Sequence, residues 1–224
     1  MNVKAVVLDV DGVITKIDSV WQYIHKKLGT LDAAKVNAEM YKRGEIDYAE
    51  WARLDVALWK GVSIETIRGI IKAIPIRLGA TEFFEFLELR NLTIIAISAG
   101  LDVVTEHLRK IFRIDYALAN RLVIRDSVVT GDVEVLVGYH DKGRVLKKIC
   151  EEVGIKTNNC IAIGDSEVDV PMFKESALGV AFNPKDEETV KSADVVVYSE
   201  DLRSLIPIIE LTETYPTRFS PPTL

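Results

Sequence analysis

Five short runs rich in Val, Ile, Leu and Ala divide this 224-residue chain, and they constrain its fold more than any other feature. None of the runs alternates strictly between apolar and polar residues, which is typical of parallel strands that are buried on both faces. Helical patterns lie between the runs, so the sequence predicts an open parallel sheet covered on both sides. The expected strands are Val3–Leu8, Leu92–Ile97, Cys160–Ile163, Leu178–Phe182 and Val195–Tyr198. The expected helices around them are Thr81–Arg90, Leu101–Ile111, Lys142–Val153, Val168–Glu175, Asp186–Lys191 and Leu202–Glu210.

Two segments interrupt this rhythm. Residues 15–77 carry apolar positions at helical spacing and predict an inserted helical bundle, with helices at Ser19–Leu28, Leu31–Tyr41, Tyr48–Trp59 and Ile64–Ala73. Tyr116–Val137 alternates and has turn signals at 125–127 and 130–132, which predicts a β-hairpin. We therefore expect a doubly wound, Rossmann-like α/β core in 1–14 and 78–211, a small α-helical cap domain in 15–77, and an extended, proline-bearing tail in 212–224.

Composition narrows the possible partners. The formal net charge is -6, which argues against nucleic acid as the main partner because phosphate backbones are bound by basic surfaces. The N-terminal apolar stretch is too short for a signal peptide, and no run approaches the length of a membrane span. Cys150 and Cys160 lie in apolar contexts and predict buried thiols in a reducing compartment. We therefore expect a cytoplasmic protein.

Polar residues follow three of the apolar runs at their carboxyl ends, where open α/β sheets bind ligands. These are Asp9-Val10-Asp11-Gly12, Ser98-Ala99-Gly100 and Gly164-Asp165-Ser166, with Asp169 four residues after Asp165. Two carboxylates about 3.5 Å apart repel by roughly 5 kcal/mol at an effective dielectric of about 20. Such a site needs cations: hard oxygen ligands favour Mg²⁺, and Lys142 is a candidate second cation.

Each of these residues also has an ordinary structural interpretation. An Asp-Gly pair after a strand is often only a tight turn. Ser98 and Asp165 are both placed to cap a helix, and Lys142 and Asp169 taken singly are typical of exposed helix positions. The combination of order, residue type and position at strand ends favours a shared site over these separate interpretations.

The motif at residues 9–13, then Ser98, Lys142 and the segment 164–169, resembles the haloacid dehalogenase-like superfamily of phosphatases. The helical insert and the segment Asp115–Glu134 make the chain most similar to the phosphoserine phosphatases within it. The resemblance implies that Asp9 is the nucleophile, forming an aspartyl-phosphate, and that Asp11 is the acid–base partner.

The resemblance also implies the remaining ligands. Ser98, Ala99 and Lys142 are expected to contact the substrate phosphate. The implied cofactor is Mg²⁺, bound by Asp9, the backbone carbonyl of Asp11 and Asp165. Asp169 is expected beside them, either near the metal or as the partner of Lys142. The implied partner is a small phosphorylated metabolite.

The chain departs from the phosphoserine phosphatases in the predicted cap. Those enzymes use an arginine and a glutamate to hold serine, whereas this chain has Asp55 and Asp18 at the aligned positions. Asp18, Tyr48 and Asp55 are therefore candidate substrate-binding residues with altered specificity. One hypothesis is a cationic substrate held by these acids and by the neighbouring aromatic rings. The alternative is that those rings form the core of the cap.

Two other functions share the same motifs. A phosphotransferase or phosphomutase would transfer the phosphoryl group to another acceptor rather than to water. A non-catalytic phosphate-binding protein could retain the fold; its support is Val168, which stands where the phosphoserine phosphatases have an asparagine, together with Asp55.

Overall fold

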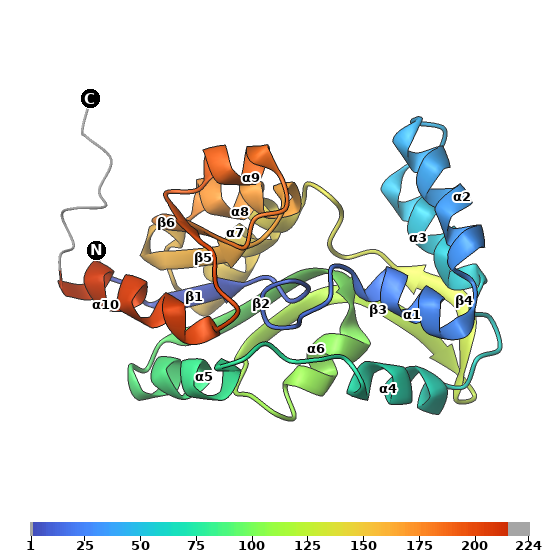
Figure 1. The fold of residues 1–224 in the computed structure, drawn as a ribbon, viewed down its shortest axis with the longest axis horizontal. Coiled ribbons are helices and arrows are strands. Elements are labelled where there is room, and N and C mark those ends of the chain that lie inside the picture. The colour runs from blue at the N-terminus through green and yellow to red at the C-terminus, as the bar shows by residue number, and fades with distance from the viewer. Residues whose placement is uncertain (1, 215–224) are drawn as a thin grey trace.

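A computed structural model describes residues 2–214, and within them seven strands form one sheet in the order β4-β3-β2-β1-β5-β6-β7 (Figure 1). Neighbouring strands run parallel except for the antiparallel pair β3 and β4. The strands are β1 (Ala5–Leu8), β2 (Thr93–Leu101), β3 (Tyr116–Arg125), β4 (Val128–Glu134), β5 (Cys160–Gly164), β6 (Leu178–Phe182) and β7 (Val195–Val197). The first strand thus lies at the centre of the sheet, between β2 and β5.

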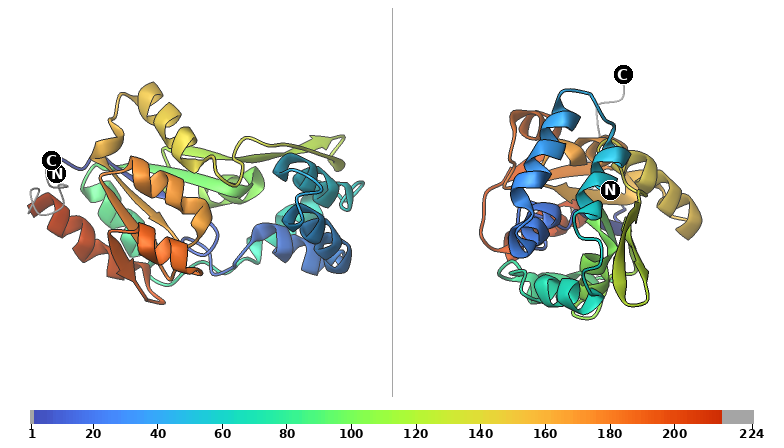
Figure 2. Two further views of the ribbon diagram at one scale, coloured as in Figure 1. Left: turned by 90° about the horizontal axis from the view of Figure 1, so that it is seen from above. Right: turned by 90° about the vertical axis from the view of Figure 1, so that its right-hand side faces the viewer.

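Helices cover the two faces of the sheet as separate layers (Figures 1 and 2). One layer contains α5 (Ala80–Leu89), α6 (Asp102–Leu108) and α10 (Ile206–Thr214), and the other contains α7 (Lys142–Val153), α8 (Val170–Glu175) and α9 (Glu187–Ser192). Successive residues of β1 alternate between them: Val6 and Leu8 belong to the core under α5 and α6, and Ala5 and Val7 to the core under α7 and α8. This two-sided burial explains why the strands are continuously apolar in sequence.

Four helices lie between β1 and α5, as the sequence predicts: α1 (Val20–Leu28), α2 (Leu31–Lys42), α3 (Tyr48–Ala57) and α4 (Ile64–Lys72). Three of them begin at an N-cap whose side chain accepts a backbone N–H, namely Ser19, Asp47 and Ser63. The β3–β4 hairpin reaches this bundle, because the backbones of Val129 and Ser127 bond to residues 61–64. The α/β class with a helical insert and a hairpin is confirmed.

Two details differ from the sequence predictions. Strand β2 continues to Leu101, so Ser98 lies within the strand rather than after it. Residues 130–132 do not form a turn: they lie inside β4, where a register shift opposite Leu122 and Ile124 accommodates them. The turn predicted at 125–127 is confirmed: the hairpin turns at Asp126 and Ser127, whose φ values of 50° and 62° are those of a tight two-residue turn.

The predicted tail 212–224 is also different at its start, because residues 212–214 belong to α10. The remaining tail residues lie outside the described part of the chain. Within the described part, no helix has both the length and the apolar character needed to cross a membrane. Cys150 and Cys160 are free and buried, with their sulfur atoms 3.6 Å apart.

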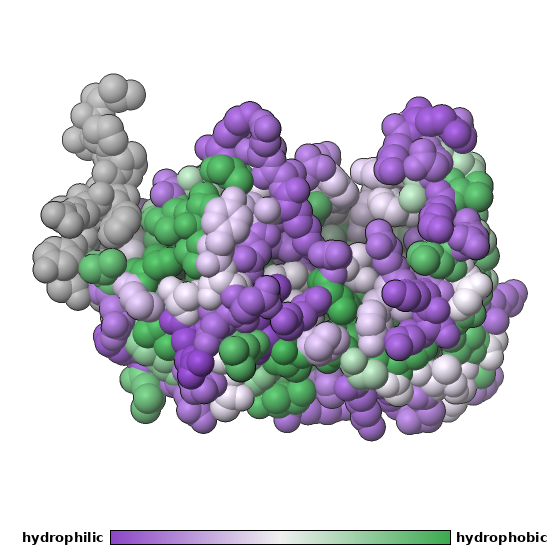
Figure 3. Space-filling view, in the orientation of Figure 1, coloured by the Kyte–Doolittle hydropathy of each residue, from purple (hydrophilic) through white to green (hydrophobic). Residues whose placement is uncertain are grey.

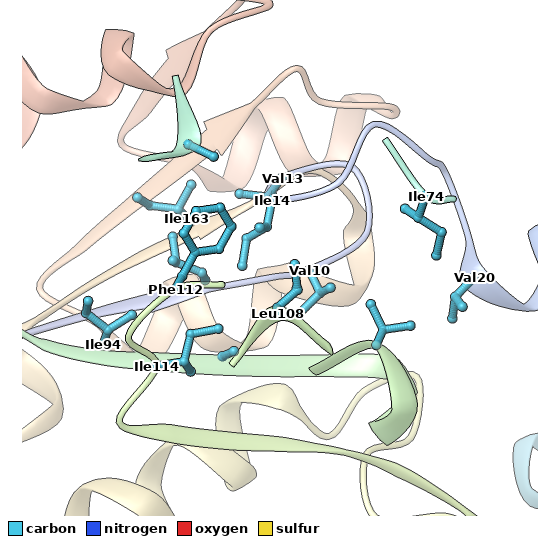
Figure 4. Packing of buried hydrophobic residues seen from close by; sticks show 14 of the residues in the cluster. Val10, Val13, Ile14, Val20, Ile74, Ile94, Leu108, Phe112, Ile114 and Ile163 are labelled. Atoms are coloured by element: carbon cyan, nitrogen blue, oxygen red, sulfur yellow. The ribbon is translucent and has the colours of Figure 1, made fainter. Parts of the chain in front are cut away.

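The loop that follows β1 is anchored by its own apolar residues. Val10, Val13 and Ile14 are almost fully buried in the larger core cluster, which also contains Phe112 and Ile163 (Figure 4). The polar residues next to them in the chain, Asp9 and Asp11, are thereby held at the end of the central strand. Because of this packing, the loop can position its side chains as precisely as a helix or strand would.

Candidate active site

A cavity of about 300 Å³ opens at the carboxyl ends of β1, β2 and β5. In the space-filling view a hollow separates the α7–α9 side of the molecule from α2 and α3 (Figure 3). We call this space the catalytic cavity. The predicted site residues that line it are Asp9, Asp11, Asp18, Tyr48, Ser98, Ala99, Lys142 and Asp165. Neither Asp55 nor Asp169 lines it.

Lys142 is the central cation of the site. It is the first residue of α7, is 1% exposed, and its Nζ lies 2.6 Å from Asp9 Oδ1 and 2.6 Å from Asp169 Oδ1. Burial disfavours its charged form, but the two carboxylates outweigh that effect and raise the pKa of Lys142. Lys142 is therefore not an exposed helix residue, and its positive charge lies directly beside the Asp9 carboxylate.

Asp169 supports the site through its contacts with Lys142 and with the Asp165 loop. Its Oδ1 accepts from the Lys142 ammonium, and its Oδ2 accepts from the backbone N–H groups of Asp165 and Ser166 at 2.8 and 3.1 Å. Both of its oxygens are thus already used. The geometry favours Asp169 as the partner of Lys142 and as a brace for the Asp165 loop over Asp169 as a metal ligand.

The carboxyl group of Asp11 bridges the core and the helical insert. Its Oδ2 accepts the backbone N–H of Val20, the first residue of α1, at 2.7 Å, while its Oδ1 is buried without a hydrogen-bond partner among residues 2–214. Burial, with the charge of Asp9 next, raises the pKa of Asp11 to about 7. A protonated Asp11 near neutral pH is what an acid catalyst requires.

The other two acids of the cavity are also perturbed. Burial, then Asp169, raises the pKa of Asp9 to about 7 despite the opposing effect of Lys142. Burial, partly offset by Lys185, raises the pKa of Asp165 to about 6. The crowded carboxylates therefore need more positive charge than the protein supplies, which favours a metal ion at this place.

The donor set fits Mg²⁺. One carboxylate oxygen from each of Asp9, Asp165 and Asp169 lies within 4.8 Å of the others. In addition, Asp11 Oδ1 is a buried oxygen that accepts no hydrogen bond from the described residues, while Asp165 Oδ2 faces the Lys185 ammonium at 2.7 Å. Hard carboxylate oxygens gathered in this way are the ligands that Mg²⁺ prefers.

Gly12 explains why the first motif contains a glycine. Its φ is +84°, and a Cβ at this position would lie 1.7 Å from Asp165 Oδ2. The loop after β1 and the loop after β5 approach each other so closely that no side chain fits between them. Gly12 therefore fixes the distance between Asp9 and Asp165.

Gly12→Ala is expected to lower the free energy of unfolding by about 2–4 kcal/mol and the activity by roughly 100-fold, because Asp165 must move. Gly154→Ala is the matched control: its φ is +70°, but nothing lies within 4 Å of the added Cβ, so only about 1 kcal/mol of backbone strain is expected. Urea denaturation and phosphate release measure the two effects. Equal losses in the two variants would contradict the close approach.

Two residues of the site went unnoticed in the sequence. Lys185, three residues after β6, places its Nζ 2.7 Å from Asp165 Oδ2 and 3.4 Å from Asp18 Oδ1. The rule that ligands gather at strand ends would have found it, had it been applied to β6. Asn120 is fully buried in β3 and donates to the carbonyls of Ala99 and Val137. Nothing in the sequence distinguishes it from an ordinary strand residue.

The carbonyl oxygen of Ala99 joins the insert to the loop beside Ser98. It accepts from Trp21 Nε1 at 3.1 Å, from the Tyr48 hydroxyl at 2.9 Å and from Asn120 Nδ2 at 2.9 Å. Trp21 belongs to α1 and Tyr48 to α3, whereas Asn120 belongs to the core. Ser98 Oγ in turn accepts the backbone N–H of Gly100 at 2.9 Å.

Asp55, a candidate substrate-binding residue in the sequence, does not line the catalytic cavity. It is buried inside the insert, where Asn37 Nδ2 donates to its Oδ1 at 2.8 Å and His25 Nε2 faces its Oδ2 at 3.4 Å. These three residues come from α3, α2 and α1 and hold the helices together. The position of Asp55 gives no support to a direct contact with the phosphate-bearing part of a substrate.

Fold and site together define a capped α/β hydrolase whose carboxylates gather at the ends of the central strands. A sequence model of the haloacid dehalogenase-like hydrolases matches residues 3–176, and the chain belongs to that family.

Its relatives match it over most of their length. The chain is 30% identical over 208 residues to a phosphoserine phosphatase of Methanocaldococcus jannaschii, covering 92% of this chain and 98% of the relative. It is also 30% identical to a phosphoserine phosphatase of Lactococcus lactis, covering 92% and 94%. A solved structure described as a phospho-aspartyl intermediate analogue of phosphoserine phosphatase superimposes with a TM-score of 0.80 and 29% identity, covering 93% of this chain and 99% of the other. The chain is therefore a hydrolase similar to the phosphoserine phosphatases.

Proposed function

We propose that the chain is a Mg²⁺-dependent phosphatase that hydrolyses a small phosphomonoester through an aspartyl-phosphate on Asp9. The observation that carries this proposal is the Asp9 carboxylate, held 2.6 Å from Lys142 in a cavity that also contains Asp11 and Ser98. The similarity to phosphoserine phosphatases, one of them solved as a phospho-aspartyl analogue, supports the same chemistry.

In the first half-reaction, an oxygen of Asp9 attacks phosphorus and the bond from phosphorus to the leaving oxygen breaks. Asp11 gives its proton to that oxygen, so the product leaves as an alcohol. Lys142 and the Ser98–Ala99 segment hold the phosphate oxygens. When bound by Asp9, Asp165 and the Asp11 carbonyl, Mg²⁺ supplies the charge neutralisation that lets a carboxylate approach an anion.

In the second half-reaction, Asp11 takes a proton from water as the water attacks the phosphorus of the aspartyl-phosphate. The bond from phosphorus to Asp9 breaks, phosphate leaves, and Asp9 is regenerated. Asp11 therefore serves once as acid and once as base, which is consistent with its pKa of about 7.

We further propose that residues 15–77 form a cap domain over a core of 1–14 and 78–211, and that the cap selects the substrate. Asp18 and Tyr48 line the catalytic cavity and are proposed to face the leaving group. The pocket is proposed to differ from that of phosphoserine phosphatases, because Asp55 replaces the expected arginine. The proposed substrate is a small cytoplasmic metabolite.

Phosphate release from an ester panel tests the proposal. Activity is expected with Mg²⁺, and a chelator is expected to lower it by at least roughly 100-fold, with recovery when Mg²⁺ is returned. Phosphoserine, phosphoethanolamine, phosphocholine and phosphoglycolate form the panel, and product analysis separates hydrolysis from transfer to another acceptor. Turnover that survives the chelator would refute metal dependence.

A further inference from the structure

A second cavity of about 230 Å³ lies inside the helical insert, directly beside the catalytic cavity. We call it the cap cavity. The two cavities share one wall, made by Ser19, Trp21, Gln22, Tyr48 and Trp51. A substrate whose phosphate lies at Asp9 would therefore have its other end at this wall.

Apart from His25, Lys35 and Asp55, the rest of the lining is apolar. Leu31, Ala34, Ala38 and Ala52 line the cap cavity together with the shared aromatic rings. A cavity of about 150 Å³ holds benzene, so the cap cavity, at about 230 Å³, has room for one ring and a few further atoms. The three-carbon head of phosphoserine would leave most of it empty.

The charged residues of the cap cavity have partners of their own. Lys35 is an exposed residue whose Nζ pairs with Asp32 Oδ1 at 2.8 Å. Asp55 accepts from Asn37 and faces His25, as described above. Each of these charges therefore already has a partner within the insert.

The hydrogen bonds of His25 show that its ring adds no positive charge to the cap cavity. Trp59 Nε1 can only donate, and it lies 3.0 Å from His25 Nδ1, so Nδ1 is the acceptor and carries no proton. The Thr30 hydroxyl, 2.7 Å from the same nitrogen, donates as well. The ring proton is therefore on Nε2, on the side of Asp55, and the ring itself is neutral.

One polar group of the shared wall remains unused. The indole N–H of Trp51 is buried and has no hydrogen-bond partner among residues 2–214. The ring itself is fixed, since it stacks on Tyr41 with centroids 4.7 Å apart. A buried donor without a partner costs about 1–3 kcal/mol, which an acceptor on a bound molecule would recover.

We propose that the cap cavity receives the leaving group of the substrate, and that this group is neutral and largely apolar, a ring or branched chain with a hydrogen-bond acceptor for Trp51. The proposal rests on the phosphatase function. It replaces the cationic leaving group suggested by the sequence, because Asp55 is committed to His25 and Asn37.

Two esters with similar alkoxide leaving groups test the proposal. The kcat/KM for 2-phenylethyl phosphate is expected to exceed that for ethyl phosphate by at least about tenfold, since the ring is buried only in the first case. Phosphoserine and phosphocholine are expected to be poorer than 2-phenylethyl phosphate. Equal values for the two alkyl esters, or a preference for phosphoserine or phosphocholine, would overturn the proposal.

A matched pair of variants locates the effect. Ala38→Phe fills the cap cavity and is expected to reduce the ratio of the two kcat/KM values to within about threefold of unity. Ala33→Phe adds the same ring to the exposed side of α2, outside both cavities, and is expected to keep the ratio. A preference retained in Ala38→Phe would place the leaving group elsewhere and overturn the proposal.

Direct binding separates this inference from the phosphatase function. Titration of tryptophan fluorescence with 2-phenylethanol is expected to saturate in the wild type and in Ala33→Phe but not in Ala38→Phe. If neither ester is hydrolysed while this pattern is seen, the phosphatase function fails and the apolar site stands. If esters are hydrolysed without the binding pattern, the apolar site fails and the phosphatase function stands.

Discussion

Asp9→Asn is expected to lower phosphatase activity by about 10⁴-fold or more, because an amide oxygen does not form the covalent intermediate. Acid-quenched wild-type protein, mixed with substrate, is expected to gain the mass of one phosphoryl group on the peptide that contains Asp9. The variant is expected to gain none. Kinetics of phosphate release and peptide mass spectrometry measure the two effects.

Asp132→Asn is the control for this prediction, since Asp132 is an exposed carboxylate in β4 that lines neither cavity. It is expected to keep wild-type activity. Full turnover in Asp9→Asn, or a phosphorylated peptide that lacks residue 9, would assign the nucleophile to another residue. Thermal unfolding of each variant shows that the loss is chemical rather than structural.

Lys142→Met is expected to remove activity and to lower the free energy of unfolding by about 3–5 kcal/mol. Lys142 is 1% exposed and pairs with both Asp9 and Asp169. Its removal leaves these two buried carboxylates without the cation that pairs with both of them. Urea denaturation without added metal measures the loss.

The double variant Lys142→Met/Asp169→Asn separates stability from catalysis. It removes one of the two uncompensated charges and is expected to recover a large part of the lost stability while remaining inactive. A double variant less stable than Lys142→Met alone would show that the Lys142 charge is not what allows Asp169 to be buried. Recovered activity would show that Lys142 is not needed at the phosphate.

The central part of the site was predictable because one physical rule governs it. Parallel strands end at the same edge of a sheet, so residues after β1 and β5 must meet whatever the details of the loops. Asp9 and Asp165 follow directly from that rule and from the apolar runs before them. Lys142 was weaker in the sequence, because a lysine at the start of a helix is usually exposed.

The side-chain contacts of the insert were less predictable, because its residues pack against one another and their positions do not follow from the sheet. Asp55 was aligned to a substrate-binding position, but a buried carboxylate takes whichever donors surround it, here Asn37 and His25. Tyr48 was selected for its ring, while its hydroxyl bonds to the Ala99 carbonyl. Contacts of this kind depend on how helices pack, and no local pattern reports them.

The Ala99 carbonyl described above has a consequence for the timing of the reaction. One oxygen, next in the chain to Ser98, is shared by donors from the cap and from the core. A departure of α1 and α3 from the core would break two of these bonds and leave Asn120 as the remaining one of the three donors. In the proposed mechanism, a movement of the cap that admits the substrate would therefore also loosen the segment that holds its phosphate.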